Sequence, residues 1–248
     1  MVIFSPFGKG IGRRFPVLRK IFLNTFGKVR ITINAEGMRR KVHLSDYLLL
    51  VLEYNGTRFE PKVTDLVKRK IRKGSVFVDV GAFYGHYSLI ASKLGAKVYS
   101  FEPEKEAFDL LVENIKLNGC KNIEIFPYAL SDRNQRGLLH VPRGNSSGGT
   151  IRKLADDRDF VMEKVEFRRL DDIIDYADLV KIDVEGAEPK VLRGMGKLIK
   201  KCRPPIIIEY VPEFYEDRRE LPSLIAKFGY AMKRIDKNNF LCEPKHGA

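Results

Sequence analysis

Five acidic residues in this sequence stand at the ends of apolar runs, where buried strands would deliver them to a common edge. They are Asp79 in VFVDVGAFYGHY, Glu102 in KVYSFEPE, Asp183 and Glu185 in LVKIDVEGAE, and Glu209 in PPIIIEY. Carboxylates are costly to bury unless something pairs with them. Their placement indicates a site for a ligand that carries positive charge or hydrogen-bond donors.

The first of these stretches joins an acid to a turn of small residues. Asp79 is followed by Gly81 and Ala82, where the backbone can approach a ligand, and by Gly85, where the next helix can pack closely. The spacing is G-x-x-x-G, not the G-x-G-x-x-G of dinucleotide sites, so a pyrophosphate cradle is not favoured. A buried carboxylate here suits an amino group or the backbone of the turn. The alternative is an ordinary strand-turn-helix unit.

The second stretch places Glu102 at the tip of the next strand, 23 residues after Asp79, and Pro103 then turns the chain away. An acid about 20 residues after such a turn commonly accepts hydrogen bonds from ribose hydroxyls. A nucleoside that carries a cationic amino group suits both acids, and S-adenosylmethionine is such a ligand. The alternative for Glu102 is a solvated charge at a strand end.

The third stretch and the strand expected beside it supply candidates for catalysis: Asp183, Glu185 and Glu209. One of them could take the proton from an acceptor hydroxyl during attack. Together they could instead grip a divalent metal that binds a sugar diol. The sequence does not decide between these chemistries, and no metal site is assigned. Glu188, in the first turn of the next helix, is suited to the helix dipole.

Apolar segments alternate with helical segments from about residue 76 onward. The expected strands span 76–80, 97–101, 123–127, 179–184 and 206–209, and the expected helices run to 94, over 105–118 and near 188–199. Residues between 127 and 179 are expected to be irregular. A terminal hairpin turns at 236–239. Strands that are apolar on both faces indicate a doubly wound, mostly parallel α/β sheet.

The N-terminal part has a different character. It predicts an amphipathic helix over 11–27, a hairpin of strands 29–34 and 38–43, and a helix over 60–72. Residues 1–45 contain ten Lys or Arg against Glu36 alone, which gives +9 of the net charge of +13. We therefore expect a basic N-terminal element, residues 1–70, before a ligand-binding domain, residues 71–248. The charge suggests an anionic partner, either RNA or a membrane surface, or else only a solubilising segment.

The order of several blocks resembles the FkbM family of S-adenosylmethionine-dependent methyltransferases over about residues 52–212. The blocks are EYNGTRFEP, FVDVGAFYGHYSLIA, YSFEPE, ENIKLNG, IEIFPYALSD, RRLDDII, LVKIDVEGAEPKVLRG and PPIIIEY. The resemblance implies a class I Rossmann-like methyltransferase with a seven-stranded sheet, which ends in the terminal hairpin expected above.

The resemblance also implies roles for individual residues. Those expected at the cofactor are Asp79, Gly81, Ala82, Phe83, Gly85, Glu102, Pro103, Tyr128 and Ala129. Asp183 and Glu185 match acids at the junction of cofactor and substrate. The sequence departs from the family at Phe83, where Asn is usual, and at His86, where an aromatic or other bulky residue is usual.

The family's members are mostly similar to O-methyltransferases of sugars and natural products. We therefore expect methyl transfer from S-adenosylmethionine to a sugar, a glycan or another hydroxylated small molecule. A tRNA or rRNA methyltransferase that uses the basic segment is one alternative, and a catalytically silent cofactor-binding subunit is another. The N-terminus lacks a signal-peptide pattern, and the three cysteines lack metal-type spacing, so we expect a cytoplasmic protein with possible peripheral membrane contact. The oligomeric state is not indicated.

Overall fold

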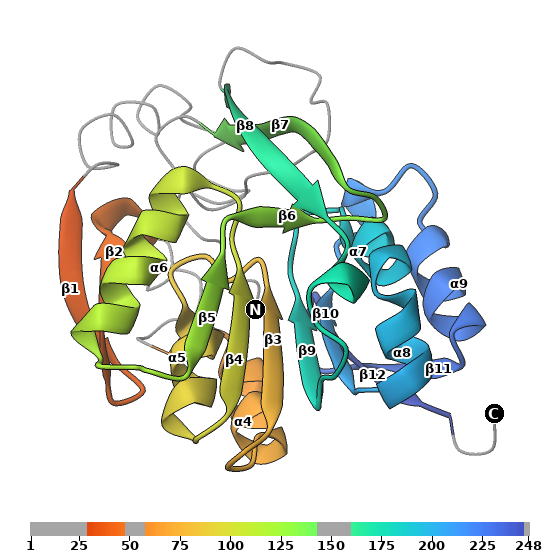
Figure 1. The fold of residues 1–248 in the computed structure, drawn as a ribbon, viewed down its shortest axis with the longest axis horizontal. Coiled ribbons are helices and arrows are strands. Elements are labelled where there is room, and N and C mark those ends of the chain that lie inside the picture. The colour runs from red at the N-terminus through yellow and green to blue at the C-terminus, as the bar shows by residue number, and fades with distance from the viewer. Residues whose placement is uncertain (1–28, 48–57, 143–159, 246–248) are drawn as a thin grey trace, which may run out of the picture.

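The computed structural model describes residues 29–47, 58–142 and 160–245, in which two smaller sheets accompany one large sheet (Figure 1). The helix expected over 11–27 lies outside these ranges. No helix in the described ranges is long and apolar enough to cross a bilayer. The expected cytoplasmic location stays a prediction.

The large sheet has seven strands in the order β11-β12-β10-β9-β3-β4-β5. Their bounds are β3 Val76–Val80, β4 Lys97–Phe101, β5 Ile123–Phe126, β9 Leu179–Ile182, β10 Ile206–Glu209, β11 Tyr230–Arg234 and β12 Asn239–Pro244. Neighbours from β10 to β5 pair in parallel, and β12 is antiparallel to both β10 and β11. The terminal hairpin is therefore confirmed. The strand order reverses between β3 and β9, the position where open α/β sheets bind ligands.

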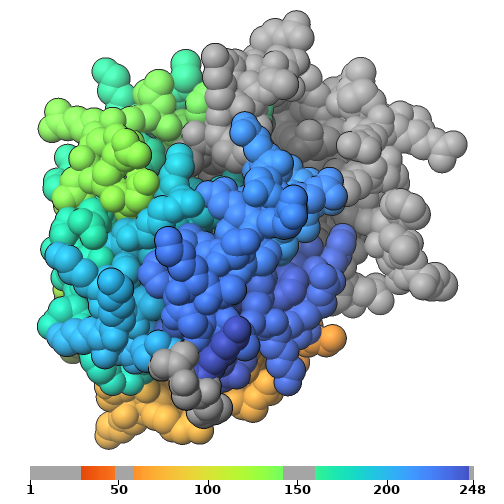
Figure 2. Space-filling view, turned by 90° about the vertical axis from the view of Figure 1, so that its right-hand side faces the viewer, coloured from red at the N-terminus to blue at the C-terminus, as the bar shows by residue number. Residues whose placement is uncertain are grey.

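Helices cover both faces of this sheet, because successive side chains of its strands point to opposite sides. Phe77 packs into a core that it shares with α4 (Pro61–Lys70) and α5 (His86–Lys93). Val78 packs into the opposite core, with α7 (Glu188–Gly194), α8 (Gly196–Cys202) and α9 (Glu220–Lys227). The last three helices, α7, α8 and α9, appear in cyan and blue in the view of Figure 2. The prediction of a doubly wound sheet is confirmed.

A three-stranded sheet occupies part of the stretch that was expected to be irregular, so that expectation was wrong. It has the order β6-β8-β7, formed by β6 Tyr128–Leu130, β7 Gln135–Pro142 and β8 Phe160–Arg168. β7 and β8 pair with each other although they are separated in sequence. Polar residues interrupt the alternation of apolar and polar positions in both strands, so the sequence pattern did not indicate them. Leu139, Val165 and Phe167 form a small core between them. In Figure 1 this sheet lies above the carboxyl ends of β3, β4 and β5.

A second difference from the expected elements lies in the segment 188–199. A single helix was predicted there, but α7 ends at Gly194 and α8 begins at Gly196, with Met195 between them. A Cβ at Gly194 would lie 1.9 Å from the carbonyl oxygen of Ser131, so another segment of backbone crosses the helix at that point. A short 3₁₀ turn, Leu170–Asp172, caps the start of α8, where Asp171 accepts hydrogen bonds from the amides of Lys197 and Leu198.

The predicted N-terminal hairpin is confirmed as β1 Arg30–Ala35 and β2 Met38–His43, joined by a turn at Glu36 and Gly37. It docks on α6 (Lys105–Leu117) through the side chain of Asn114. Asn114 Oδ1 accepts from the Lys41 amide at 2.6 Å, and its Nδ2 donates to the carbonyls of Lys41 (3.0 Å) and Tyr84 (2.9 Å). One buried amide therefore ties the hairpin to the turn after β3. The domain boundary near residue 70 stays a prediction.

Candidate active site

The turn after β3 is shaped by close backbone packing. Gly81 has φ +80°, and a Cβ there would lie 1.9 Å from the carbonyl oxygen of Asp183. Gly85 has φ +87°, and its Cβ would lie 2.6 Å from Leu111 Cδ1. Both positions require glycine, for conformation and for space. Contact with the end of β9 therefore accounts for Gly81 without any ligand.

Asp79 faces the interior of the protein beside α5. Its side chain accepts a hydrogen bond from the Ser88 hydroxyl, which also contacts the Ser100 hydroxyl at 2.7 Å. Burial raises the pKa of Asp79 to about 6, and the Ser88 hydrogen bond opposes that rise. These contacts give Asp79 a structural function, namely to hold the start of α5 on β3. Its expected contact with the cofactor stays a prediction.

Glu102 lies at the end of β4 and holds two backbone segments together. Its Oε2 accepts from the Phe83 amide at 2.8 Å, and its Oε1 accepts from the Glu104 amide at 3.0 Å. Each carboxylate oxygen can accept a second hydrogen bond. Burial raises the pKa of Glu102 to about 7. Glu102 therefore joins the turn after β3 to the end of β4, where Pro103 follows, and retains acceptor capacity for hydroxyl donors.

Phe83 adopts the left-handed conformation, with φ +49°. Asn tolerates this conformation better than Phe does, which explains why Asn is usual here in the family that the sequence resembles. The Phe83 ring stacks on Tyr84 with centroids 3.6 Å apart, and the Tyr84 hydroxyl donates to Asp46. Ala82 is buried beside it.

Tyr128 and Ala129 begin β6 directly after β5, at the same edge of the sheet as Glu102. The Tyr128 ring lies 6.1 Å from that of Phe126 and faces the Arg168 guanidinium at 5.5 Å. The arrangement supplies an aromatic surface near Glu102. The assignment of these residues to the adenine stays a prediction.

Asp183, Glu185 and Glu209 converge as the sequence predicted. Their carboxylate oxygens lie within 4.8 Å of one another, because β9 and β10 are parallel neighbours that end together. Glu185 reaches the group from a turn in which its φ is +53°. Burial, together with the charge of Asp183, raises the pKa of Glu185 to about 8 and that of Glu209 to about 10. Burial and the neighbouring negative charge therefore favour the protonated forms of both glutamates.

A buried lysine pairs with this group: the sequence suggested Lys181 only as a possible salt-bridge partner of Glu185, and in the structure it pairs with Asp183. Lys181 is 1% exposed, and its Nζ donates to Asp183 Oδ2 at 3.0 Å. It also lies 5.5 Å from the centroid of the Tyr87 ring. The charges of Asp183, Glu60 and Glu209 raise the pKa of Lys181 against the effect of burial. The signal available in the sequence was a charged residue inside the apolar run LVKI.

Two further residues extend the group on the α4–α5 side of the sheet. Glu60, 5% exposed, accepts from the Tyr87 hydroxyl and, at 2.8 Å, from Nδ2 of Asn239. Asn239 stands opposite Glu209 in the β10–β12 pair. No spacing rule links residues so far apart in sequence, so only the fold reveals them.

Glu188 binds the backbone of the turn that carries Glu185, and this contact goes beyond the capping of α7. Its Oε1 accepts from the amides of Val184 (3.1 Å) and Gly186 (3.3 Å), and its Oε2 accepts from the Tyr215 hydroxyl. The side chain therefore folds back over the turn that carries Glu185. Glu188 holds the geometry of the carboxylates and is itself buried.

The strand order, the glycine turn after β3 and the acids at the ends of β4, β9 and β10 together define the class I Rossmann-like methyltransferase domain. Residues 79–234 match the family model described as "Methyltransferase FkbM domain". This match spans more than half of the chain, which therefore belongs to the FkbM methyltransferase family.

Individual relatives match over shorter regions. A ribosomal protein L11 methyltransferase of Caldanaerobacter subterraneus is 39% identical over 88 residues, 35% of this chain and 28% of the relative. The hexuronic acid methyltransferase AglP of Haloferax volcanii is 29% identical, covering 58% of this chain and 59% of the relative. The 2-O-methyltransferase NoeI of Sinorhizobium fredii is 30% identical, covering 52% and 60%. The chain thus spans less than two thirds of the length of each.

Proposed function

We propose that the protein transfers a methyl group from S-adenosylmethionine to a hydroxyl of a sugar, a glycan or another hydroxylated small molecule. One observation carries the proposal. Glu102 and the group formed by Asp183, Glu185 and Glu209 stand at the same edge of one parallel sheet. A nucleoside-binding acid and a group of potential proton acceptors therefore flank the point where the strand order reverses.

The residues at this edge fit the cofactor. Glu102 is 6% exposed, is fixed by two backbone amides and retains free acceptor positions, which suits the two hydroxyls of a ribose. Tyr128 supplies an aromatic surface on the same side of the sheet. When bound, the cofactor supplies an activated methyl group on a sulfonium. The acids beyond Glu102 would then face positive charge, which favours their ionised forms.

The task of the protein is then to align the acceptor and to take its proton. Lys181 donates a hydrogen bond to Asp183, so that carboxylate is fixed in position. Burial and the charge of Asp183 raise the pKa values of Glu185 and Glu209, which makes these two carboxylates stronger bases once they are ionised. We assign proton transfer to one of these two residues and positioning of the acceptor to Asp183.

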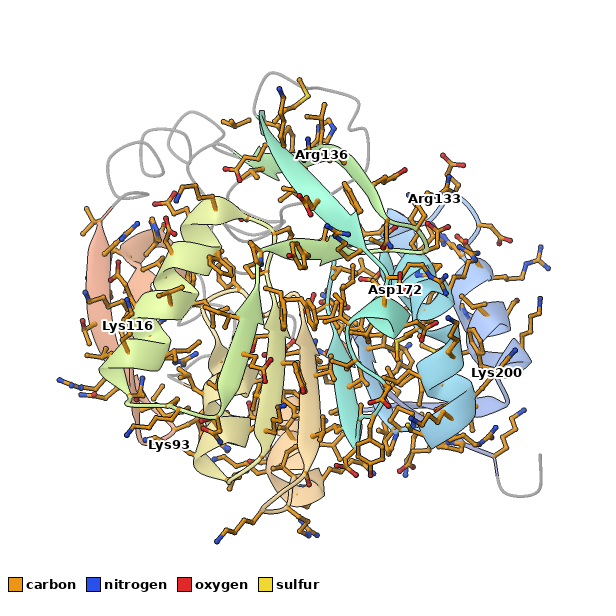
Figure 3. The ribbon with its side chains drawn as sticks, viewed as in Figure 1. Lys93, Lys116, Arg133, Arg136, Asp172 and Lys200 are labelled. Carbon is orange, nitrogen blue, oxygen red and sulfur yellow. The ribbon has the colours of Figure 1, made fainter. Side chains whose placement is uncertain are left out.

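A sugar acceptor is supported by the names of two relatives, a hexuronic acid methyltransferase and a 2-O-methyltransferase. The described part of the basic N-terminal segment lends less support to RNA. Arg30 pairs with Glu106 and Glu113, and Lys41 pairs with Glu113, so these charges are already engaged. Other lysines lie apart, with Lys93 and Lys116 on the hairpin side of the molecule and Lys200 on the opposite side (Figure 3). RNA binding and a silent binding subunit stay predictions.

The test is a transfer assay with radiolabelled S-adenosylmethionine and four classes of acceptor: small sugars including uronic acids, lipid-linked glycans, total tRNA and rRNA. Label should enter a sugar or a glycan, and Glu102→Ala should reduce incorporation. The matched control is Glu124→Ala, because Glu124 lies on β5 in an exposed ion pair with Lys97, away from the site. Incorporation into RNA alone would refute the proposed acceptor. Failure of calorimetry to detect cofactor binding would refute the proposed activity.

A further inference from the structure

Arg40 is a buried cation, and one edge of its guanidinium group makes no hydrogen bond to the described residues. It lies on β2 and is 5% exposed, yet its Nε and Nη2 have no hydrogen-bond partner in the part of the chain that the structure describes. These two nitrogens form one edge of the guanidinium plane, the fork that binds a carboxylate or a phosphate through two parallel hydrogen bonds. Leaving buried donors unpaired is costly. A ligand with two acceptor oxygens would therefore satisfy the two free donors on this edge of Arg40.

The other edge of Arg40 is fixed by a chain of hydrogen bonds. Its Nη1 lies 2.8 Å from Nδ1 of His86, and His86 Nε2 lies 2.8 Å from the Thr64 hydroxyl. Arg can only donate, so Nδ1 accepts, and the proton on Nε2 points to Thr64. The Thr64 hydroxyl in turn donates to the Phe59 carbonyl at 2.9 Å. The fork is held in one orientation, and His86 is neutral because burial and the Arg40 charge lower its pKa.

The charge of Arg40 is not neutralised by a contact within the described residues. Glu36 is the acid that most favours its charged form, but Glu36 is bound to Arg58 at 2.9 Å and to Lys68. Tyr87 acts in the same direction as Glu36. Burial without a contacting anion lowers the pKa of Arg40 to about 10. Among the described residues, Arg40 is thus a buried cation without a contacting anion.

The position of Arg40 places this cation beside the proposed cofactor turn. Its neighbour Lys41 is bonded through Asn114 to the Tyr84 carbonyl, within the turn that follows β3. Its own partner, His86, is the first residue of α5, directly after Gly85. The first connection fixes β2 against the turn, and the second fixes the guanidinium beside His86, the residue that follows Gly85.

We propose that the Nε–Nη2 edge of Arg40 binds an oxyanion, a carboxylate, that belongs either to the cofactor or to an acidic acceptor sugar. The inference rests on the proposed function for the identity of these two sources. It assigns a binding role to the hairpin, and it gives His86, which departs from the family pattern, the role of an acceptor that orients Arg40.

Calorimetry distinguishes the two sources. The probes are S-adenosylmethionine and its decarboxylated analogue, followed by glucuronate and glucose in the presence of S-adenosylhomocysteine. If the cofactor is the source, wild type should bind S-adenosylmethionine roughly 10- to 100-fold more tightly than the analogue, and Arg40→Met should abolish that preference. If the acceptor is the source, the same loss should appear in the preference for glucuronate over glucose.

The matched control is Arg39→Met, an exposed arginine one residue earlier on the same strand, which should change neither preference. Arg40→Lys retains the charge without the fork, so it should retain only part of the preference, and it serves if Arg40→Met does not fold. Wild type that shows neither preference, or an Arg40→Met variant that keeps both, would overturn the inference. If wild type binds S-adenosylmethionine but shows neither preference, the inference about Arg40 fails and the proposed function still stands.

Discussion

Replacing Gly81 by Ala tests the contact between the turn after β3 and the end of β9. The new Cβ would lie 1.9 Å from the Asp183 carbonyl oxygen, whereas ordinary contacts begin at 3.4 Å, so the gap must widen by about 1.5 Å. The positive φ costs about 1–2 kcal/mol, and the overlap adds about 1–3 kcal/mol. We therefore expect Gly81→Ala to lower the free energy of unfolding by about 2–5 kcal/mol, measured by urea denaturation.

The displacement should also reach the chemistry, because Asp183 would move with its backbone. A shift of about 1 Å in a positioning group can cost about 10²-fold in rate, so methyl transfer should fall by at least that factor. Gly74→Ala is the matched control, since Gly74 has φ +86° and nothing within 4 Å of its Cβ position. It should lose only the conformational cost of about 1–2 kcal/mol and retain activity. Equal losses in both variants, with transfer rates unchanged, would refute the reasoning.

Three further predictions concern the buried charges. Glu102→Ala should weaken S-adenosylmethionine binding by about 1–3 kcal/mol in calorimetry, because two ribose hydroxyls lose their acceptor; unchanged affinity would remove Glu102 from the site. Burial raises the pKa of Glu102 from 4.5 to about 7, and ribose hydroxyls donate to its ionised form, so affinity should rise as the pH increases through about 7 and stay flat in Glu102→Gln. Because the pKa of Glu102 is higher in the folded protein than in the unfolded chain, Glu102 also contributes to the free energy of unfolding. This contribution has its full value below pH 4.5 and is lost as the pH rises through about 7. Lys181→Met should lower the free energy of unfolding by about 3–5 kcal/mol, since it strands the Asp183 carboxylate, and adding Asp183→Asn should restore part of that loss. A double variant no more stable than Lys181→Met would argue against the pairing.

The parts of the fold that follow from local sequence patterns were predictable. The strand Val76–Val80 and the hairpin strand Met38–His43 have the bounds expected, because apolar runs and turn residues mark them directly. The convergence of Asp183 with Glu209 also followed, since parallel neighbours end at the same edge. The predicted elements were wrong where a backbone segment that is distant in sequence packs against a helix. The backbone of Ser131 crosses close to Gly194, where the predicted single helix ends and a second helix begins after Met195.

The sequence predicted which acidic residues lie at this edge of the sheet, but it did not predict the positions of the buried Lys181 and Arg40. Each acid stood at the end of an apolar run, which is a local signal. Arg40 depends on His86, a partner from another element, whereas Lys181 pairs with Asp183 two residues along the same segment, and the sequence does not show that the lysine is buried there. The contact of Asp79 with Ser88 was not predicted from the sequence, and its contact with a cofactor stays a prediction.

The docking of the hairpin on α6 has a consequence for the order of folding. Lys41 and Asn114 are 73 residues apart in sequence, and the two-stranded β1–β2 ribbon is marginally stable without its partner. At a synthesis rate of about 5–20 residues per second, the ribbon waits roughly 4–15 s before Asn114 exists. During that interval the inward-facing Met38 and Val42 are exposed on the nascent chain. Hairpin variants that weaken β1–β2 pairing should therefore reduce the yield of folded protein more than they reduce the stability of the protein once folded.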